Sequence, residues 1–408
     1  MEALLLVILG LLALGGVGLG LIWAEVIARI VRTRRDLPSA DRWVEGARGE
    51  PPAGRVCIVV PAHNEQGKIG RLIASLRRQT HPDLRVVLCL DRCTDNTLGE
   101  AREAIGEDDR FEIIEIGSCP SDWAGKVHAV HTGVETSVGA RGAEWLLFTD
   151  ADTSFDPECV RAALAIATTR SDGLVSLLST LTNRAWFERV VQPMSGLELV
   201  RQYPLLKASQ GDARERRAFA NGQFLLFRRD VYDAIGGHEA VHDALLEDIA
   251  LAEEVRRCGA GASLLLAGGM VRCSMYDDWA EYRRGWKRIY TESARRKSDR
   301  LRKNARVIRT MGTLAPLVGV GALGVGLAMA LSGEPLGWIG VGSGAFGLLI
   351  WGLGVACVLA SGGAALWTVV LTPLGAWLTG SILREAARDL DEGRPTSWGG
   401  REYARPRR

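Results

Sequence analysis

The chain has 408 residues, of which 47% are hydrophobic, and a formal net charge of only +2. This near-neutral total conceals an uneven distribution of charge along the chain, so it does not by itself indicate a partner. The cysteines lack the paired CxxC spacing of a zinc site and the pattern of a disulfide framework, which excludes a small disulfide-stabilised or zinc-stabilised domain.

The first predicted element is a membrane anchor. Residues 3–23 are uncharged and apolar over about the length that a bilayer core requires. The acidic start, the length of the run and the missing small-residue cleavage site argue against a cleaved signal peptide. Arginines at positions 29, 32, 34 and 35 follow, and the positive-inside rule places them in the cytoplasm. We therefore predict a transmembrane anchor over residues 1–24 and a basic juxtamembrane segment with a linker over residues 25–54.

A single cytosolic domain is predicted over residues 55–277. Short apolar or β-branched runs alternate there with segments of helical length, and these runs occupy residues 56–60, 85–90, 111–116 and 144–148. Such alternation indicates an α/β fold with a Rossmann-like, mostly parallel sheet that binds ligands at the carboxyl ends of its strands. No GxGxxG follows the first of these runs, which argues against a dinucleotide-binding oxidoreductase, and no Walker-type GK[ST] loop is present.

Acidic and polar residues follow three of these runs. The first run ends in VVPAHNE, the second in LDRCTDNT and the fourth in TDAD, which contains Asp150 and Asp152. A buried carboxylate is costly unless a cation or a hydrogen-bond donor meets it. Two carboxylates at a strand end can hold a hard divalent cation and leave its other positions to substrate phosphates. A polar turn before the next helix is the alternative interpretation.

A basic segment precedes the C-terminal apolar region. Residues 283–309 contain twelve Lys and Arg residues against only Glu292 and Asp299. A basic segment directly cytoplasmic of a membrane span is attracted to anionic headgroups. We therefore predict a basic amphipathic interfacial helix over residues 278–309, whose apolar side chains dip into the interface. A solvated helix face is the simplest alternative, and we expect no nucleic-acid partner.

Residues 310–384 are predicted to form a C-terminal transmembrane region of two to three helices. Apolar stretches cover residues 310–332 and 335–383, and the second is long enough for two passes joined near residues 361–363. Three spans would place the Arg-rich tail outside, whereas its charge favours the cytoplasm. The number of spans therefore stays open at this point, although we expect residues 385–408 to form a cytosolic tail.

These motifs together resemble the family 2 glycosyltransferases of the GT-A fold over most of residues 55–290. VVPAHNE, LDRCTDNT, TDAD and LLEDIAL occur in the order of that family. A closer likeness is to membrane-anchored members associated with hopanoid and carotenoid-type lipid biosynthesis. The segments that carry this closer likeness are DWAGKVHAVHTG (122–133), residues 219–251, MYDDWAEYRRGW (275–286) and SWGGREY (397–403).

The resemblance implies roles for the matched residues. The residues that would cradle the nucleoside are Pro61, Ala62, Glu65 and Asp91. The residues that would lie near the diphosphate, ribose or sugar are Lys126, Asp150, Gly222 and Gln223. Asp152, together with Asp150, would bind Mg²⁺ or Mn²⁺, and Asp248, with Glu247 beside it, would act as the general base. Leu90 replaces the first aspartate of the family's usual acidic pair, so Asp91 would act alone.

Simpler structural roles compete with some of these assignments. Lys126 would otherwise be a solvated helix residue, and Gly222 would otherwise only permit close packing of strands. Glu247 and Asp248 would otherwise only begin a helix, because acidic side chains suit the positive end of its dipole.

The implied function is inverting transfer of one sugar from a nucleotide sugar, expected to be a UDP-sugar, to a membrane lipid such as a hopanoid or carotenoid. The QxxRW motif of processive synthases corresponds here to residues 282–286, where only Trp286 is kept. A processive polysaccharide synthase and an inactive lipid-binding scaffold remain the alternatives. We expect a multi-pass protein of the cell membrane, with a cytoplasmic catalytic domain and an anionic membrane surface as a partner.

Overall fold

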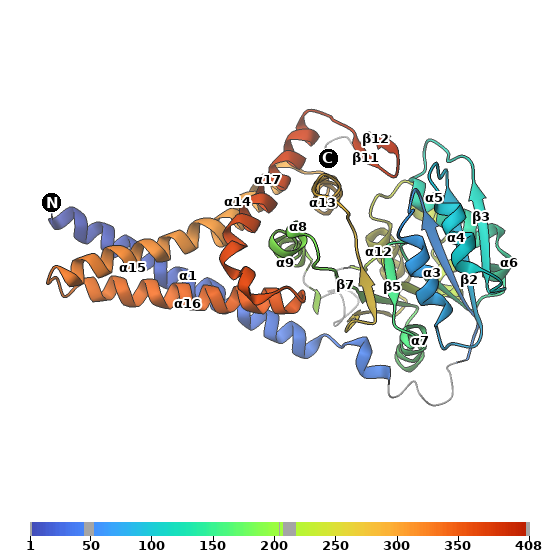
Figure 1. Cartoon of the computed structure of the whole chain (residues 1–408), viewed down its shortest axis with the longest axis horizontal. Coiled ribbons are helices and arrows are strands. Elements are labelled where there is room, and N and C mark those ends of the chain that lie inside the picture. The colour runs from blue at the N-terminus through green and yellow to red at the C-terminus, as the bar shows by residue number, and fades with distance from the viewer. Residues whose placement is uncertain (1, 45–52, 204, 207–217, 405–408) are drawn as a thin grey trace.

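A computed structural model describes the chain except for residues 1, 45–52, 204, 207–217 and 405–408 (Figure 1). An α/β domain lies at one end of the molecule and a bundle of long apolar helices at the other (Figure 1). Most of the second half of the predicted linker, residues 45–52, lies outside the described residues.

The α/β domain is built on a seven-stranded sheet with the strand order β3-β2-β1-β4-β8-β6-β9. The four predicted strands are present and pair in parallel as β1 (Val56–Ala62), β2 (Leu84–Asp91), β3 (Phe111–Ile116) and β4 (Trp145–Phe148). The remaining three strands were not predicted: β6 (Leu174–Leu178), β8 (Leu225–Arg228) and β9 (Ala262–Leu266). Since only β8 runs antiparallel to its neighbours, the prediction of a mostly parallel α/β sheet is confirmed.

Helices cover both faces of this sheet. The helices on one face are α3 (Ile69–Arg77), α4 (Thr97–Ile105) and α7 (Cys159–Arg170). The helices on the other face are α5 (Gly125–Thr136), α6 (Val138–Arg141), α11 (Arg229–Ala234) and α12 (Glu247–Cys258). Along β1, Ile58 faces the first core and Val59 the second, so both alternating positions are apolar. This burial on two faces explains why the strand is a continuous apolar run.

A small second sheet lies beside the first. It consists of β5 (Thr153–Phe155), β10 (Val271–Cys273) and β7 (Thr180–Leu181). The chain passes directly from β4 into β5 through Asp150 and Asp152, so these two aspartates lie where the two sheets meet. The backbone N–H of Ser274, just after β10, donates to the carbonyl oxygen of Asp152 at 3.1 Å and fixes the position of this turn.

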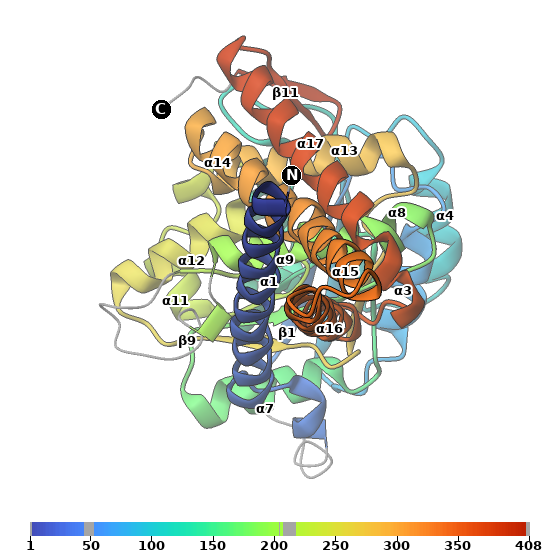
Figure 2. The same ribbon diagram turned by 90° about the vertical axis from the view of Figure 1, so that its left-hand side faces the viewer.

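Four helical segments are long and apolar enough to cross a membrane: residues 4–36, 298–331, 337–361 and 366–391. The first is α1 (Glu2–Asp36), and the second joins α14 (Ser298–Arg309) to α15 (Ala315–Leu331) through a π-helical turn. The others contain α16 (Gly337–Ser361) and α17 (Thr372–Asp391). One N-terminal and several C-terminal apolar helices were predicted, and this prediction is confirmed. Helices α1, α15 and α16 form one bundle (Figures 1 and 2).

Helix α17 begins and ends on the side of the α/β domain. Its first turn packs on α8 (Trp186–Val190), because a Cβ atom at Gly375 would lie 2.0 Å from the carbonyl oxygen of Val190. The end of the preceding helix is also on this side, since the Asn183 side chain donates to the Gly362 carbonyl at 2.9 Å. Toward its end, Glu385 pairs with Arg283 at 2.6 Å.

Buried polar contacts join α17 to the rest of the protein. The Thr379 hydroxyl lies 3.2 Å from the hydroxyl of Ser195 on α9 (Gln192–Gln202). The same Ser195 hydroxyl accepts a hydrogen bond from Tyr282 at 2.9 Å. All three side chains are fully buried. They therefore form a fixed junction between α17, α9 and the helix that carries Tyr282.

The prediction of one interfacial helix over residues 278–309 is wrong. The segment forms two helices, α13 (Trp279–Ser293) and α14, separated by a turn in which Arg295 and Arg296 have positive φ angles of 56° and 55°. The apolar side chains expected to enter the membrane interface are mostly buried in the protein, among them Trp286, Tyr290, Leu301 and Ile308. The apolar faces of both helices pack with α17 and α9, which satisfies them without lipid.

Candidate active site

Three charged side chains from three separate elements meet at the carboxyl edge of the sheet. Lys126 lies in the first turn of α5, Asp150 follows β4 and Glu247 begins α12. The Nζ atom of Lys126 lies 2.6 Å from Asp150 Oδ1 and 2.5 Å from Glu247 Oε1. Burial opposes the charge of Lys126, but the two carboxylates outweigh burial and raise the pKa of the lysine. Lys126 is therefore an ion-paired group of the site and not a solvated helix residue.

Asp248 lies next to this cluster and has its own hydrogen-bond donors. The backbone N–H of Gly222 donates to Asp248 Oδ2 at 2.9 Å, and that of Ile249 donates to Oδ1 at 2.8 Å. Burial and the adjacent charge of Glu247 raise the pKa of Asp248 to about 6. Burial also acts against the charge of Glu247, but Lys126 outweighs it and lowers the pKa of Glu247. The two carboxylates therefore differ in their partners, since Glu247 is ion-paired with Lys126 and Asp248 accepts hydrogen bonds from backbone N–H groups.

Gly222 lies at the centre of the charged cluster. A Cβ atom at this position would lie 3.3 Å from both Lys126 Nζ and Glu247 Oε1, and 3.4 Å from Asp248 Oδ2. Gly222 therefore borders the charged cluster, and its contact with the donor stays a prediction. The side chain of Gln223 is used differently, because its Oε1 accepts hydrogen bonds from the Ser179 hydroxyl and, at 3.4 Å, from the Asn221 amide. These bonds hold the loop before β8.

Asp152 presents an oxygen that the protein leaves without a partner. Its Oδ1 atom is buried and makes no hydrogen bond. Burial and the neighbouring Asp150 raise the pKa of Asp152 to about 7. Glu65, expected near the nucleoside, contributes to the same acidic region, since burial raises its pKa to about 8 despite Lys68 at 3.7 Å. These features fit a bound cation. It would give the Asp152 oxygen a partner and would offset the cost of burying several neighbouring carboxylates.

The chemistry of these residues suits a hard divalent cation shared with a ligand. Within the described part of the chain, no group of three or more His, Cys, Asp or Glu side chains is arranged to hold a metal ion by itself. Asp150 and Asp152 supply one or two carboxylate ligands, which is the typical protein share of a Mg²⁺ site completed by phosphates.

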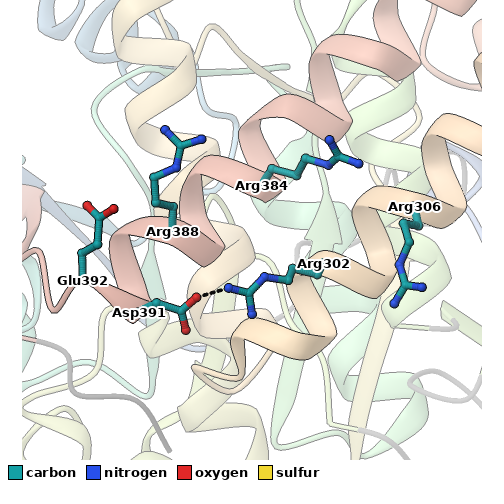
Figure 3. Close-up of a pocket in the computed structure, with 6 residues that line it drawn as sticks. All are labelled: Arg302, Arg306, Arg384, Arg388, Asp391 and Glu392. Carbon is teal, nitrogen blue, oxygen red and sulfur yellow. Dashed lines mark hydrogen bonds and ion pairs between the residues drawn. The ribbon is translucent and has the colours of Figure 1, made fainter.

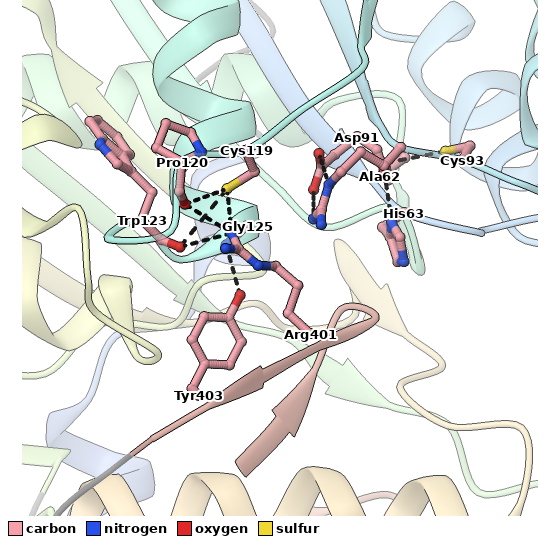
Figure 4. A network of polar contacts seen from close by, with 11 residues as sticks. Ala62, His63, Asp91, Cys93, Cys119, Pro120, Trp123, Gly125, Arg401 and Tyr403 are labelled. Atoms are coloured by element: carbon pink, nitrogen blue, oxygen red, sulfur yellow. Dashed lines mark hydrogen bonds and ion pairs between the residues drawn. The ribbon is translucent and has the colours of Figure 1, made fainter. Parts of the chain in front are cut away.

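A second group of predicted residues lies at the ends of β1 and β2. Asp91, labelled in Figure 4, is paired with Arg92, whose Nε and Nη2 atoms lie 2.7 and 2.5 Å from the two carboxylate oxygens. Asp91 is therefore ion-paired with the adjacent arginine of LDRC. The expectation that it acts without a second aspartate stays a prediction. His63 Nδ1 lies 2.6 Å from the Asp91 carbonyl, and the Ala62 carbonyl, next to Pro61, accepts a hydrogen bond from the Cys93 thiol.

The predicted residues thus form two groups. Lys126, Asp150, Glu247, Asp248 and Gly222 lie together, with Asp152 beside them. Pro61, Ala62 and Asp91 lie at the other group, near the start of α5. Sequence reasoning missed Arg92 and Lys68, and it gave no role to the C-terminal residues Arg401 and Tyr403, which also reach this edge (Figure 4).

The fold and the site define an α/β domain with an acidic centre at the carboxyl edge of a mostly parallel sheet. Residues 57–236 match the family model described as Glycosyl transferase family 2. Residues 57–236 therefore form a domain that is similar to the family 2 glycosyltransferases, and apolar helices flank it.

Two curated relatives are also named as glycosyltransferases. The 4,4'-diaponeurosporenoate glycosyltransferase of Staphylococcus aureus (strain MRSA252) is 23% identical over 266 residues, which cover 64% of this chain and 68% of the relative. The protein of the same name from Staphylococcus haemolyticus (strain JCSC1435) is 23% identical over 254 residues, or 61% of this chain and 63% of that protein.

Two solved structures are similar over most of the chain. The mannosyltransferase PcManGT from Pyrobaculum calidifontis, in complex with GDP-Man and Mn²⁺, has a TM-score of 0.45 and 16% identity over 93% of this chain and 98% of that chain. Residues 1–349 of S. aureus TarS, in complex with UDP-GlcNAc, have a TM-score of 0.40 and 13% identity over 86% of this chain and 96% of that chain.

Proposed function

We propose that this chain is an inverting glycosyltransferase that moves one sugar from a nucleotide sugar, expected to be a UDP-sugar, to a membrane lipid. The observation that carries the proposal is the placement of Asp248, with a raised pKa, beside Lys126 and the DxD turn. A lipid acceptor is supported by the apolar helices and by the name of the staphylococcal relatives, which specifies a carotenoid-type acid.

The proposed reaction is a single displacement. Asp248 accepts the proton of the acceptor hydroxyl while the acceptor oxygen bonds to the anomeric carbon of the sugar. The bond from that carbon to the diphosphate breaks on the opposite face, so the configuration inverts. General base action of this kind is typically worth about 10² to 10⁴ in rate. Lys126, with its ammonium beside Asp150, is placed to contact the donor.

Asp152, with Asp150, would hold Mg²⁺ or Mn²⁺ in this proposal. When bound, the cation supplies positive charge that stabilises the departing diphosphate. The orphaned Oδ1 atom of Asp152 supports this assignment.

Membrane transfer assays would test the proposed function. Membranes that contain the chain are incubated with radiolabelled UDP-sugars, and the lipid fraction is extracted and its mass determined. A labelled glycolipid is the expected product. A labelled polymer would instead indicate the processive synthase, and no product with any nucleotide sugar would indicate an inactive scaffold.

The membrane position is the next part of the proposal. The three-helix bundle of α1, α15 and α16 crosses the cell membrane, with the α/β domain and α17 on the cytoplasmic side. The arginines that follow α1's apolar stretch support this orientation through the positive-inside rule.

Arginines between α14 and α17 give the anionic membrane surface a specific contact. Figure 3 shows a hollow lined by Arg302, Arg306, Arg384, Arg388, Asp391 and Glu392. Arg302 is hydrogen-bonded to Asp391. The hollow lies between α14, which leads into the apolar helix α15, and the polar end of α17. Its arginines are therefore available to lipid phosphates.

Charge reversal in this hollow is expected to weaken use of a lipid acceptor. The variant with Arg306→Glu and Arg384→Glu should raise the apparent KM for the acceptor at least about fivefold in vesicles rich in anionic lipid, because each cation contributes about 1 kcal/mol. The KM for the nucleotide sugar should not change. The control is Arg71→Glu on the exposed surface of α3. Equal acceptor kinetics in both variants at every anionic lipid content would contradict the assignment.

A further inference from the structure

A C-terminal β-hairpin folds back over the α/β domain. It consists of β11 (Thr396–Trp398) and β12 (Arg401–Tyr403), joined by Gly399 and Gly400. Both glycines have positive φ angles, 54° and 70°, which a tight two-residue hairpin turn requires. The hairpin follows α17 and extends away from it toward β3 and α5 (Figure 1).

The second strand of the hairpin binds the segment between β3 and α5. The Tyr403 hydroxyl accepts a hydrogen bond from the backbone N–H of Gly125 at 3.0 Å. Arg401 Nη1 donates to the carbonyl oxygens of Pro120 and Trp123 at 3.0 and 3.2 Å (Figure 4). These contacts are made by two alternate residues of one strand. Glu402, between them, is exposed. Alternate side chains of a strand point to opposite faces, so the face with Arg401 and Tyr403 packs on the α/β domain and the other face is open to solvent.

The hairpin turn reaches the ends of the neighbouring strands. A Cβ atom at Gly400 would lie 2.7 Å from His63 Nε2, so the turn touches the residue that follows β1. A Cβ atom at Gly125 would lie 3.2 Å from Asp91 Oδ2 and 3.6 Å from the Tyr403 hydroxyl. The hairpin therefore lies over the ends of β1, β2 and β3. This is the edge at which we place the nucleoside.

A further contact ties the hairpin to the start of α12. The Arg288 guanidinium lies 3.6 Å from the ring centroid of Trp398, a favourable cation–π geometry. The same guanidinium donates to the carbonyl oxygen of Leu245, two residues before Glu247, at 2.5 Å. Arg288 is only 9% exposed, so this position is fixed by the surrounding protein. The hairpin thus lies against His63, next to Pro61 and Ala62, and is linked through Arg288 to the segment that leads into α12.

We propose that this hairpin, residues 396–403, completes the donor site by closing over the bound nucleoside, with Arg401 and Tyr403 as positioning residues. The inference rests on the proposed function. A two-stranded hairpin is at best marginally stable by itself, so its order depends on the contacts described above. A nucleoside held between the hairpin and the strand ends adds to these contacts, and donor binding and hairpin closure then stabilise each other.

The contacts favour a lid over a plug that blocks the site. Arg401 and Tyr403 bind backbone atoms of residues 120–125, which precede Lys126 in the chain. The ammonium of Lys126 is turned toward Asp150 and Glu247, where we place the diphosphate and the sugar. The hairpin therefore covers the nucleoside end of the site and leaves the diphosphate end to the charged cluster.

Nucleotide titrations of the full-length chain test this proposal. Calorimetry with UDP and with GDP, in the presence of Mn²⁺, is carried out on the wild type, Arg401→Ala and Tyr403→Phe. Each variant should raise the Kd of the bound nucleotide about fivefold or more, because each removes a hydrogen bond of the closed hairpin. Glu402→Gln is the matched control on the exposed face and should match the wild type. Arg401→Lys should recover part of the affinity.

Two further readouts separate donor closure from a purely structural role. Nucleotide should protect the amides of residues 117–125 from hydrogen exchange in the wild type and the control, and not in Arg401→Ala. In turnover, the variants should raise the donor KM and leave the acceptor KM unchanged. Tighter nucleotide binding by the variants would show a plug and overturn the proposal, as would unchanged affinity. A wild type that binds neither nucleotide would instead contradict the proposed function itself.

Discussion

Asp248→Asn is expected to lose about 10² to 10⁴ of the rate of transfer to a hydroxyl acceptor and to keep its affinity for nucleoside diphosphate. The asparagine keeps the size of the side chain but cannot accept the proton. Since the pKa of Asp248 is raised to about 6, the wild-type rate should fall as the pH drops below that value, where the carboxylate becomes protonated. The variant should lack this acidic limb. Rates from about pH 5 to 8 and calorimetric nucleotide titrations check both parts.

The matched control for this variant is Glu253→Gln, on the same helix and away from the charged cluster. Its rate and its pH profile should equal those of the wild type. A collapse of nucleotide affinity in Asp248→Asn would contradict the assignment and make Asp248 part of the donor site. An acceptor that reacts through a carboxylate, already ionised, should depend much less on Asp248, so the two acceptor types can be compared in one preparation.

Asp152→Asn is expected to remove the metal-dependent part of nucleotide affinity. The substitution deletes a ligand charge without changing the volume of the side chain. Because the buried Oδ1 atom makes no hydrogen bond, the neutral amide should be tolerated by the fold. Titration of UDP with and without Mn²⁺ measures the effect, and thermal unfolding of the same samples without metal verifies that the fold is intact.

Asp109→Asn serves as the control for Asp152→Asn, because Asp109 is exposed at the far end of the sheet, before β3. It should bind nucleotide and metal like the wild type. If Asp152→Asn showed the same gain in affinity on addition of Mn²⁺ as the wild type, the DxD turn would not be the metal site.

The parallel half of the sheet and the acidic turn could be predicted because their signals are local. The runs that became β1 to β4 are largely apolar, and each is followed by a helix of ordinary length or by the acidic turn itself. Asp150 and Asp152 stand out because they change the polarity abruptly at the end of a buried strand. No pairing between distant residues was needed to find either feature.

The partners of the site residues could not be predicted, because they depend on contacts between distant segments. Lys126 is separated from Glu247 by the strands β4 to β8, and nothing in the local sequence shows that one ammonium bridges two carboxylates. The antiparallel strand β8 was also missed. Its apolar run is only four residues long and lies within residues 219–251, which were interpreted as a family motif.

The amphipathic pattern of residues 278–309 correctly predicted helical structure with an apolar face. The surface that covers this face was predicted wrongly. Trp286 and Tyr290 face α17 and α9, whereas lipid was expected to cover them. The spacing of apolar residues along a helix shows that one face is apolar. It does not show which surface covers that face. The acidic residues of α17, such as Glu385, were the available signal, because they complement the basic residues of α13.

The buried junction of Ser195, Thr379 and Tyr282 fixes α17 against α9 and α13. Under the proposed function, this rigidity would help to hold Asp248 at one height above the membrane surface. Acceptors would then be selected by how far the reactive group projects from the bilayer. A lipid of the same chemistry that is anchored too deep or projects too far would not be used.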